Sequence, residues 1–113
     1  MLLTIMKSKL HMVTISDTQP YYEGSIGIDK ELIAAAGLIP GEKVHVLNFN
    51  NSNRFETYVI EGHKGEISLR GPAAKLGKKG DKVVIVAYGQ ATPEEAKNFK
   101  PKVVHVDERN EIK

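Results

Sequence analysis

Apolar and polar residues alternate along most of the chain with the period of two that is typical of half-buried β-strands. The alternation is clearest in KVHVLNFN (43–50), RFETYVIEG (54–62) and KVVIVAYG (82–89). A turn-forming NNSN run joins the first two segments, so residues 43–61 are predicted to form a hairpin. Further strands are predicted at LLTIM (2–6), KLHMVTIS (9–16), GSIGI (24–28), EISLR (66–70) and KVVHVDE (102–108).

Two segments carry helical signals instead. DKELIAAAGL (29–38) has a capping aspartate at its start and a glycine at its end, and TPEEAKNF (92–99) begins as a capping box. GPAAKLGKKGD (71–81) is predicted to be a loop with one helical turn, DTQP (17–20) to break a strand, and RNEIK (109–113) to fray. Short strands with one or two small helices predict a mainly β fold, a closed β-barrel, and disfavour βαβ units.

The length, composition and net charge of the chain narrow the class of protein to which it can belong. A length of 113 residues suits a single domain, and 41% hydrophobic and 27% charged residues are ordinary for a globular protein. The formal net charge of +2 gives no reason to expect a nucleic-acid or membrane partner. The absence of cysteine excludes disulfides, thiolate catalysis and cysteine zinc sites, and it favours a cytoplasmic location. We expect no signal peptide and no membrane span, because no apolar run is long enough.

Two familiar motifs fail on inspection. GPAAKLGKK is not a P-loop, because five residues separate Gly71 from Gly77 and Lys79 stands where a magnesium-binding Ser or Thr is needed. The four histidines are scattered without the spacing of a metal site, so no metal is expected.

Candidate chemistry lies on the predicted strand RFETYVIEG (54–62). Arg54, Glu56 and Tyr58 would share one strand face and offer a carboxylate clamp beside a weak acid, although a solvent-facing strand side explains the pattern equally well. Thr57 would point to the other face, so Thr57 and Tyr58 serve one pocket only where the strand twists, bulges or ends.

Two further short motifs leave alternatives open. Lys9 and His11 share a face in the same way as the residues above, with a polar edge strand as the alternative. A serine directly after a glycine, as in YYEGSIGID (21–29), suggests attack of the Ser25 hydroxyl on the preceding Gly24 carbonyl. Such an attack is geometrically difficult without a strained backbone, which glycine tolerates. An ordinary Gly-Ser turn explains the pair as well, and spacing alone does not decide.

Larger blocks of the chain resemble the pyruvoyl-dependent aspartate 1-decarboxylase family. The resemblance covers nearly the whole chain and is carried, in family order, by KSKLH, YYEGSIGID, AAG, NSNRFETYVI, GPAA, GDKVVIVAY, PEEA and KPKVVHVDE. It implies a double-psi β-barrel that assembles as a homotetramer, with active sites between neighbouring subunits.

The resemblance also implies that the chain cleaves itself between Gly24 and Ser25. Ser25 would perform an N→O acyl shift, with Thr57 steadying the tetrahedral intermediate, and β-elimination and hydrolysis would convert residue 25 into a covalent pyruvoyl group. The products would be a β chain, residues 1–24, and an α chain, residues 25–113. The family uses this group as its cofactor, with no metal and no pyridoxal phosphate.

The implied reaction converts L-aspartate to β-alanine and CO₂ for pantothenate and coenzyme A biosynthesis, through a Schiff base on the pyruvoyl group. Tyr58 matches the proton donor and Arg54 a ligand of the substrate carboxylate. The other residues that match the substrate site are Lys9, His11, Tyr22, Thr57, Gly71, Pro72 and Ala73. A non-catalytic barrel, and a pyruvoyl decarboxylase for another acidic amino acid, are the alternative functions.

One position departs from the family pattern. Arg70 precedes Gly71-Pro72-Ala73-Ala74, where the family commonly has Asn. Arg70 would either add a second cationic ligand for a carboxylate or turn away from the site. The need for a maturation factor is left open.

Overall fold

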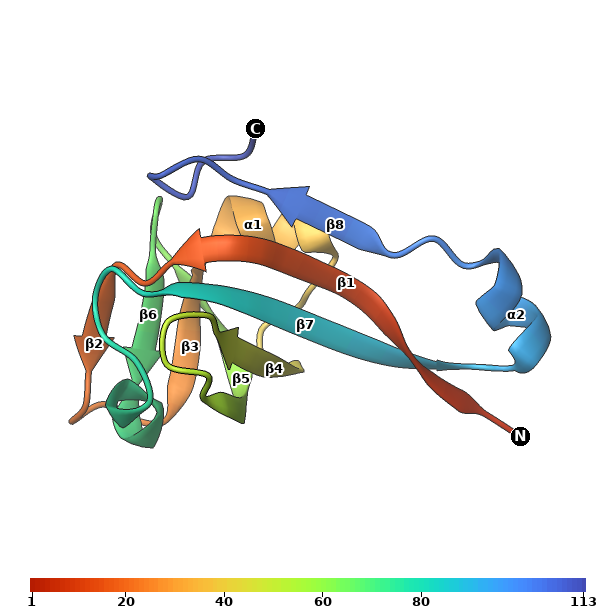
Figure 1. Ribbon diagram of the computed structural model, residues 1–113, viewed down its shortest axis with the longest axis horizontal. Coiled ribbons are helices and arrows are strands. Elements are labelled where there is room, and N and C mark those ends of the chain that lie inside the picture. The colour runs from red at the N-terminus through yellow and green to blue at the C-terminus, as the bar shows by residue number, and fades with distance from the viewer.

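Eight strands form one strongly curved sheet in the computed structural model, which describes all 113 residues (Figure 1). The elements are β1 (Leu3–Thr14), β2 (Asp17–Gln19), β3 (Ser25–Asp29), α1 (Lys30–Ala36), β4 (Lys43–Asn48), β5 (Arg54–Gly62), β6 (Ile67–Arg70), a 3₁₀ helix (Gly71–Lys75), β7 (Lys82–Ala91), α2 (Pro93–Asn98) and β8 (Lys102–His105). The predicted hairpin, both helices and the single helical turn after β6 are confirmed. No helix has the length and apolar character needed to cross a membrane.

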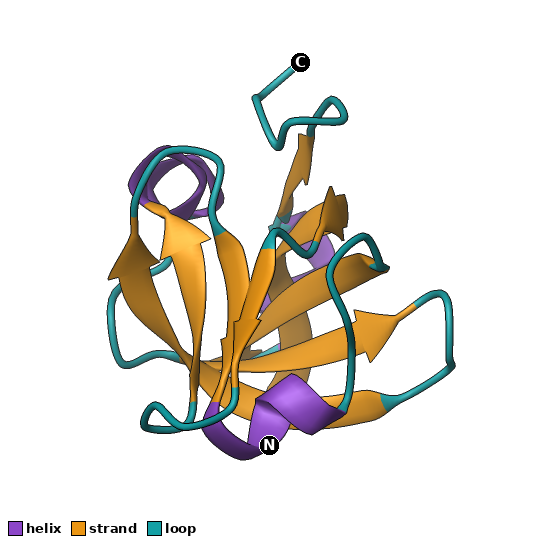
Figure 2. Ribbon diagram, turned by 90° about the vertical axis from the view of Figure 1, so that its left-hand side faces the viewer, coloured by secondary structure: helices purple, strands orange, loops and turns teal.

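The sheet has the strand order β2-β6-β3-β5-β4-β7-β1-β8. Strand β3 is parallel to β5 and antiparallel to β6, and β1 is parallel to β8 and antiparallel to β7. This mixed, curved sheet with two short helices confirms the mainly β, double-psi β-barrel class. Figure 2 shows the strands wrapped around a common interior.

The predicted β-barrel is not closed by hydrogen bonds, because the end strands β2 and β8 of the sheet do not pair. The two ends of the sheet are instead joined by the chain itself, because β1 continues into β2 through Ile15 and Ser16. The N–H groups of these two residues donate to Asp81 O at 2.9 Å and to Ile67 O at 2.8 Å. The predicted break at residues 17–20 was wrong, since Asp17–Gln19 pairs with β6 as a short strand.

The core is built from the inward-facing residues of the strands. Leu10, Ile26, Val59 and Leu69, from four different strands, are all fully buried. Burying one such side chain contributes about 1.5–3 kcal/mol. Helix α1 covers one end of this core with its own apolar side chains, namely Leu32, Ile33 and Ala36.

Local signals set the ends of both helices, as the sequence predicts. The Asp29 carboxylate accepts a hydrogen bond from the Glu31 N–H at 2.8 Å, and Gly37 ends α1 with a left-handed φ of 67°. Thr92 and Glu95 form the reciprocal capping box of α2.

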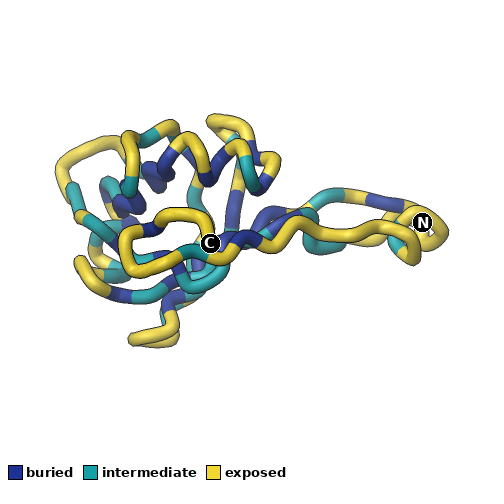
Figure 3. Tube along the Cα trace, turned by 90° about the horizontal axis from the view of Figure 1, so that it is seen from above, coloured by how far each residue is buried: buried dark blue, intermediate teal, exposed yellow.

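An arm projects from the barrel along the long axis of the molecule. It consists of the start of β1, the end of β7 and α2, and it leaves Leu2, Leu3 and Phe99 largely exposed (Figure 3). The arm lengthens the molecule to 42 Å, against 28 Å and 24 Å in the other directions.

The C-terminal segment is tied to the barrel, so the prediction that residues 109–113 fray was wrong. Asn110 is 3% exposed, accepts a hydrogen bond from the Thr14 N–H, and donates to the carbonyls of Thr14 and Gly65. Val106 and Ile112 form a further bridge. One buried amide therefore joins the C-terminal segment to the end of β1 and to the loop before β6.

Replacing Asn110 with alanine is expected to destabilise the protein by about 1–3 kcal/mol, because Thr14 and Gly65 would lose their polar partner. Urea unfolding at fixed protein concentration measures the loss. Asn98→Ala is the matched control, since Asn98 is exposed and its amide makes one hydrogen bond of 3.4 Å within α2. Equal stabilities of the two variants would contradict the conclusion that the Asn110 amide holds the C-terminal segment to the barrel.

Candidate active site

The Gly24–Ser25 bond lies where a loop enters the sheet. Ser25 is the first residue of β3 and is 2% exposed, whereas Gly24 ends the preceding loop. The Ser25 hydroxyl makes only a long contact of 3.5 Å with the Glu23 carbonyl. The pair is therefore a loop-to-strand junction and not a turn, and the serine hydroxyl is buried with almost no competing partner.

Strand pairing places three functional side chains in one row. Ser25 lies directly opposite Arg70 on β6, and the Ile26–Val59 pair, continued by one residue, brings Tyr58 of β5 beside Ser25. Directly opposite residues of neighbouring strands point to the same face. Ile26 and Val59, one residue further along, face the core. The row Tyr58–Ser25–Arg70 thus crosses β5, β3 and β6 on the outer face of the sheet, where Figure 1 shows these strands side by side.

A cavity of about 360 Å³ opens over this row. Tyr22 and Glu23, from the loop before the cleavage position, contribute to its wall together with Tyr21 and Ile60. Of the residues predicted for the site, the structure brings Ser25, Tyr58 and Tyr22 together here.

Thr57 lies on β5 near the start of the β3–β5 pairing. That pairing runs from Ile26–Val59 to Asp29–Gly62, so Thr57 and Gly24 each lie two residues before its first pair. Alternation along β5 sends Thr57 and Tyr58 to opposite faces. Tyr58 lines the Ser25 cavity, whereas Thr57 does not.

Gly71 and Pro72 pack directly against Gly24. Gly71 has φ 64°, and a Cβ added to it would lie 2.7 Å from both the N and Cα atoms of Gly24 and 2.8 Å from the Tyr22 carbonyl oxygen. A Cβ added to Gly24 would lie 3.4 Å from Pro72 Cδ. Close backbone approach is the reason that glycine is needed at position 71. The next residue, Ala73, belongs to the hydrophobic core and does not line the cavity.

Arg70 lines the cavity and is held by Ser68 of its own strand and by Glu66, the residue just before that strand. Its Nη2 donates to Glu66 Oε2 at 2.7 Å, its Nε donates to Ser68 Oγ at 3.3 Å, and its guanidinium lies 5.6 Å from the centre of the Tyr22 ring. Of the two alternatives for Arg70, the structure supports a place in the site and not a position turned away from it.

Glu66 is a functional candidate that our reading of the sequence missed. Its side chain is 5% exposed, and it also accepts hydrogen bonds from Ser68 Oγ at 2.5 Å and from the His63 N–H at 3.1 Å. Burial alone raises the pKa of the Glu66 carboxyl, but the hydrogen bonds from Ser68, Arg70 and His63 outweigh it and bring the pKa below its ordinary value. The available signal was the i, i+2, i+4 spacing of Glu66, Ser68 and Arg70, which puts three polar groups on one strand face.

Lys9, His11 and Arg54 do not line this cavity within one chain. Lys9 and His11 lie on β1, and the strands β5, β4 and β7 separate β1 from β3. Arg54 shares the outer face with Tyr58 but lies about 13 Å away along β5, at roughly 3.3 Å per residue.

His11 packs edge-on against His105, with ring centres 5.4 Å apart, and its Nδ1 is buried without a hydrogen-bond partner. Burial first, and then the neighbouring Lys9 and His105, lower the pKa of His11 below its ordinary value. His11 is therefore a polar group that is still unsatisfied within a single chain.

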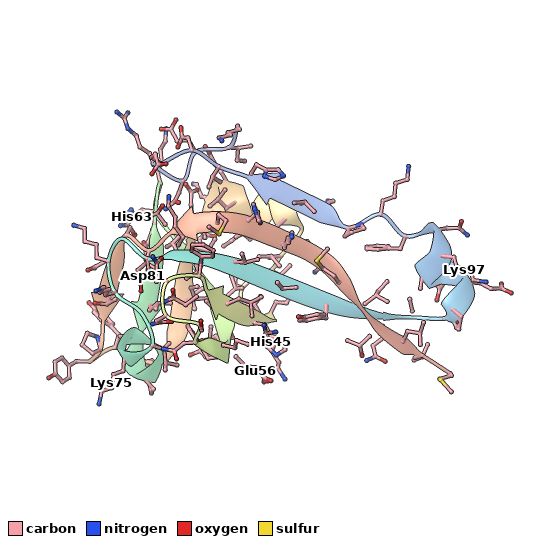
Figure 4. The ribbon with its side chains drawn as sticks, viewed as in Figure 1. His45, Glu56, His63, Lys75, Asp81 and Lys97 are labelled. Atoms are coloured by element: carbon pink, nitrogen blue, oxygen red, sulfur yellow. The ribbon has the colours of Figure 1, made fainter.

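Glu56 belongs to a separate network of polar side chains on the outer surface. It binds Lys43 at 2.9 Å and His45 at 3.1 Å, and the other ring nitrogen of His45 is 3.2 Å from the Tyr88 hydroxyl. Figure 4 shows Glu56 and His45 close together on this surface. Glu56 is thus not a partner of Arg54, and no group of three His, Asp or Glu side chains is arranged to hold a metal ion.

Comparison with known proteins shows the family of this chain. The aspartate decarboxylase family matches residues 1–113. Aspartate 1-decarboxylase of Salinibacter ruber is 51% identical over 97% of this chain and 77% of its own length. Those of Campylobacter hominis and Phenylobacterium zucineum are each 50% identical, over 98% and 100% of this chain and 97% and 98% of their own lengths. The chain belongs to the aspartate decarboxylase family.

Proposed function

We propose that this chain is a self-processing, pyruvoyl-dependent decarboxylase that converts L-aspartate to β-alanine and CO₂. The observation that carries the proposal is the row Tyr58–Ser25–Arg70 beside the Gly24–Ser25 bond, in a chain that belongs to the aspartate decarboxylase family. The β-alanine would supply pantothenate and coenzyme A biosynthesis, in the cytoplasm.

Self-processing begins with attack of the Ser25 Oγ on the Gly24 carbonyl carbon, which exchanges the amide for an ester. β-Elimination then breaks the Ser25 Cβ–O bond, leaving a carboxylate on Gly24 and dehydroalanine at residue 25. Water converts the dehydroalanine to a pyruvoyl group and releases ammonia. The products are residues 1–24 and residues 25–113, and a maturation factor that accelerates the shift is compatible with this scheme.

The surroundings of the bond suit the first step. The Ser25 hydroxyl has only one long contact, so attack does not break a strong hydrogen bond. The Thr57 hydroxyl, on the strand that pairs with β3, supplies a donor to the oxyanion of the tetrahedral intermediate. Gly71 and Pro72 pack against Gly24, which limits its movement.

The residues that surround position 25 also suit the second reaction. A pyruvoyl group at residue 25 supplies a carbonyl that condenses with the substrate amine and accepts the electron pair left by CO₂. Tyr58 holds a proton beside residue 25 and delivers it to the carbon that loses the carboxylate. Tyr22 closes one wall of the cavity.

A second copy of the chain completes the site. Lys9, His11 and Arg54 lie outside the Ser25 cavity within one chain, and His11 retains an unsatisfied Nδ1. In a homotetramer with sites between subunits, a neighbouring copy supplies these cationic and polar groups. Arg54 then binds the substrate carboxylate through its planar fork, and Lys9 adds positive charge.

Intact-mass analysis and a product assay test the proposal together. We expect two fragments that correspond to residues 1–24 and 25–113, the larger with a blocked N-terminus, and β-alanine formation from L-aspartate. A chain that stays whole and inactive would favour a non-catalytic barrel. A cleaved chain that prefers L-glutamate would indicate a pyruvoyl decarboxylase of another acidic amino acid.

Tyr58→Phe should separate the two reactions. The variant is expected to cleave normally but to lose about 10²–10⁴-fold in kcat, because the proton donor is removed while Ser25 and Thr57 remain. Tyr88→Phe is the matched control, since Tyr88 is 39% exposed against 40% for Tyr58 and its hydroxyl lies outside the cavity. Unchanged turnover in the Tyr58 variant would remove Tyr58 from the mechanism.

A further inference from the structure

The Glu66 carboxylate occupies space that two glycines leave free on the outer face of the sheet. A Cβ on Gly27 would collide with Glu66 Oε2 and with Ser68 Oγ, and a Cβ on Gly62 would lie 2.8 Å from the Glu66 carboxyl. A buried carboxylate is costly unless it is fully paired. Glu66 is paired by Arg70, by Ser68 and by His63, through both the N–H of His63 and its exposed ring nitrogen Nε2 at 3.2 Å. The three strands β3, β5 and β6 together leave the space that the carboxylate fills.

The contacts with Glu66 and Ser68 fix the guanidinium of Arg70 in one orientation. Nε donates to Ser68 and Nη2 to Glu66, and Cζ lies over the Tyr22 ring, 5.6 Å from its centre. A guanidinium has five N–H donors, and the hydrogen bonds within the chain do not use Nη1. Arg70 is 20% exposed and lines the Ser25 cavity, so its unused donors are available to a ligand there.

The ion pair also cancels the charge of Arg70. Glu66 is ionised at neutral pH, since its hydrogen bonds keep its pKa below the ordinary value. An arginine alone would place a full positive charge beside residue 25, whereas the Glu66–Arg70 pair places directed N–H donors there with no net charge.

We propose that Arg70 binds the carboxylate of the substrate that leaves as CO₂, and that Glu66 is a positioning residue that both orients Arg70 and neutralises it. The proposal rests on the proposed decarboxylase function. The leaving carboxylate is bonded to the carbon that carries the substrate amine, so it is the substrate group nearest to residue 25 and to Arg70.

Charge cancellation has a catalytic reason. Loss of CO₂ removes negative charge from the carboxylate, so a full positive charge at that point stabilises the bound substrate more than the transition state. Such binding lowers KM but also lowers kcat. Neutral, directed donors hold the carboxylate in place without this penalty.

The test compares Glu66→Gln with Arg70→Gln in the processed enzyme. Removing the Glu66 charge should leave Arg70 an unbalanced cation, so Glu66→Gln should lower both KM for L-aspartate and kcat about tenfold. Arg70→Gln should raise KM about tenfold, because the donors are lost. Calorimetric titration with succinate, which cannot react, should show tighter binding to Glu66→Gln and weaker binding to Arg70→Gln.

The direction of the KM change distinguishes this role from a purely structural one. If Glu66 only supports the fold, Glu66→Gln should raise KM and weaken succinate binding, as Arg70→Gln does, and that result would overturn the proposal. The double variant Glu66→Gln/Arg70→Gln should recover kcat relative to Glu66→Gln alone, since no unbalanced cation remains. Failure to recover would also count against charge cancellation.

Two further results distinguish failure of this proposal from failure to fold and from failure of the proposed function. If Glu66→Gln does not fold, the succinate affinity of Arg70→Gln decides, and an affinity within twofold of the wild type would overturn the proposal. If the unmodified chain is neither cleaved nor active on L-aspartate, the proposed function itself fails. An active wild type with unaffected variants rejects only the role of the Glu66–Arg70 pair.

Discussion

Ser25→Ala is expected to leave the chain in one piece and without decarboxylase activity. Alanine lacks the oxygen that attacks the Gly24 carbonyl, so neither the ester nor the group derived from it can form. The side chain is buried and its hydroxyl makes one long contact, so the fold should be unaffected. Intact mass should show a single species of full length, where the wild type shows two fragments.

Ser8→Ala is the matched control for this variant. Ser8 is 1% exposed, comparable to Ser25, and its hydroxyl has no hydrogen-bond partner, so its loss should leave both stability and cleavage unchanged. Cleavage of the Ser25 variant between residues 24 and 25, or β-alanine formation by the intact chain, would rule out the serine mechanism.

Gly71→Ala is expected to combine a loss of stability with slow or absent cleavage. A left-handed backbone costs a non-glycine residue roughly 1–2 kcal/mol. The added methyl group would also collide with Gly24 N, Gly24 Cα and the Tyr22 carbonyl, and overpacking typically adds about 1–3 kcal/mol. Because the collision is with Gly24 itself, the Gly24–Ser25 bond has to shift from the position in which the Ser25 hydroxyl attacks it. Urea unfolding and the rate of fragment formation measure the two effects.

Gly37→Ala separates the free-energy cost of a left-handed backbone from the cost of the steric collision. Gly37 has φ 67°, close to that of Gly71, but the nearest atom to an added Cβ is the flexible end of Lys102 at 3.5 Å. This variant should therefore carry only the backbone cost and cleave at the normal rate. If both variants cleave equally fast, Gly71 is a conformational requirement of the loop and has no role in holding the scissile bond.

The strands and helices could be predicted because their signals are local. The alternation in residues 54–62 follows from burying one face of β5, and the Asp29 and Thr92 caps satisfy N–H groups within the next turn of chain. Asn110 and the Asp17–Gln19 strand were mispredicted because their partners, Thr14, Gly65 and β6, are distant in the sequence. A segment rich in polar residues looks mobile until its partners are known.

The same contrast between local signals and contacts distant in the sequence applies to the residues of the candidate site. Ser25, Thr57 and Tyr58 were predicted because the motifs around them resemble a family, whereas Glu66 was missed because it follows a turn-like HKG run and has no local sign of burial. Arg70 was left with two alternatives, since its direction depends on Glu66 and on the register between β3 and β6.

By itself, the sequence determined the strand-rich class, both helices, the family resemblance and the Gly24–Ser25 pair as the bond of interest. Only the tertiary structure decided that Tyr58, Ser25 and Arg70 form one row beside a common cavity, and that a buried Glu66 pairs with Arg70. The physical reason is that periodicity records whether a residue faces the core, while strand order and register arise from hydrogen bonds between segments far apart in the chain.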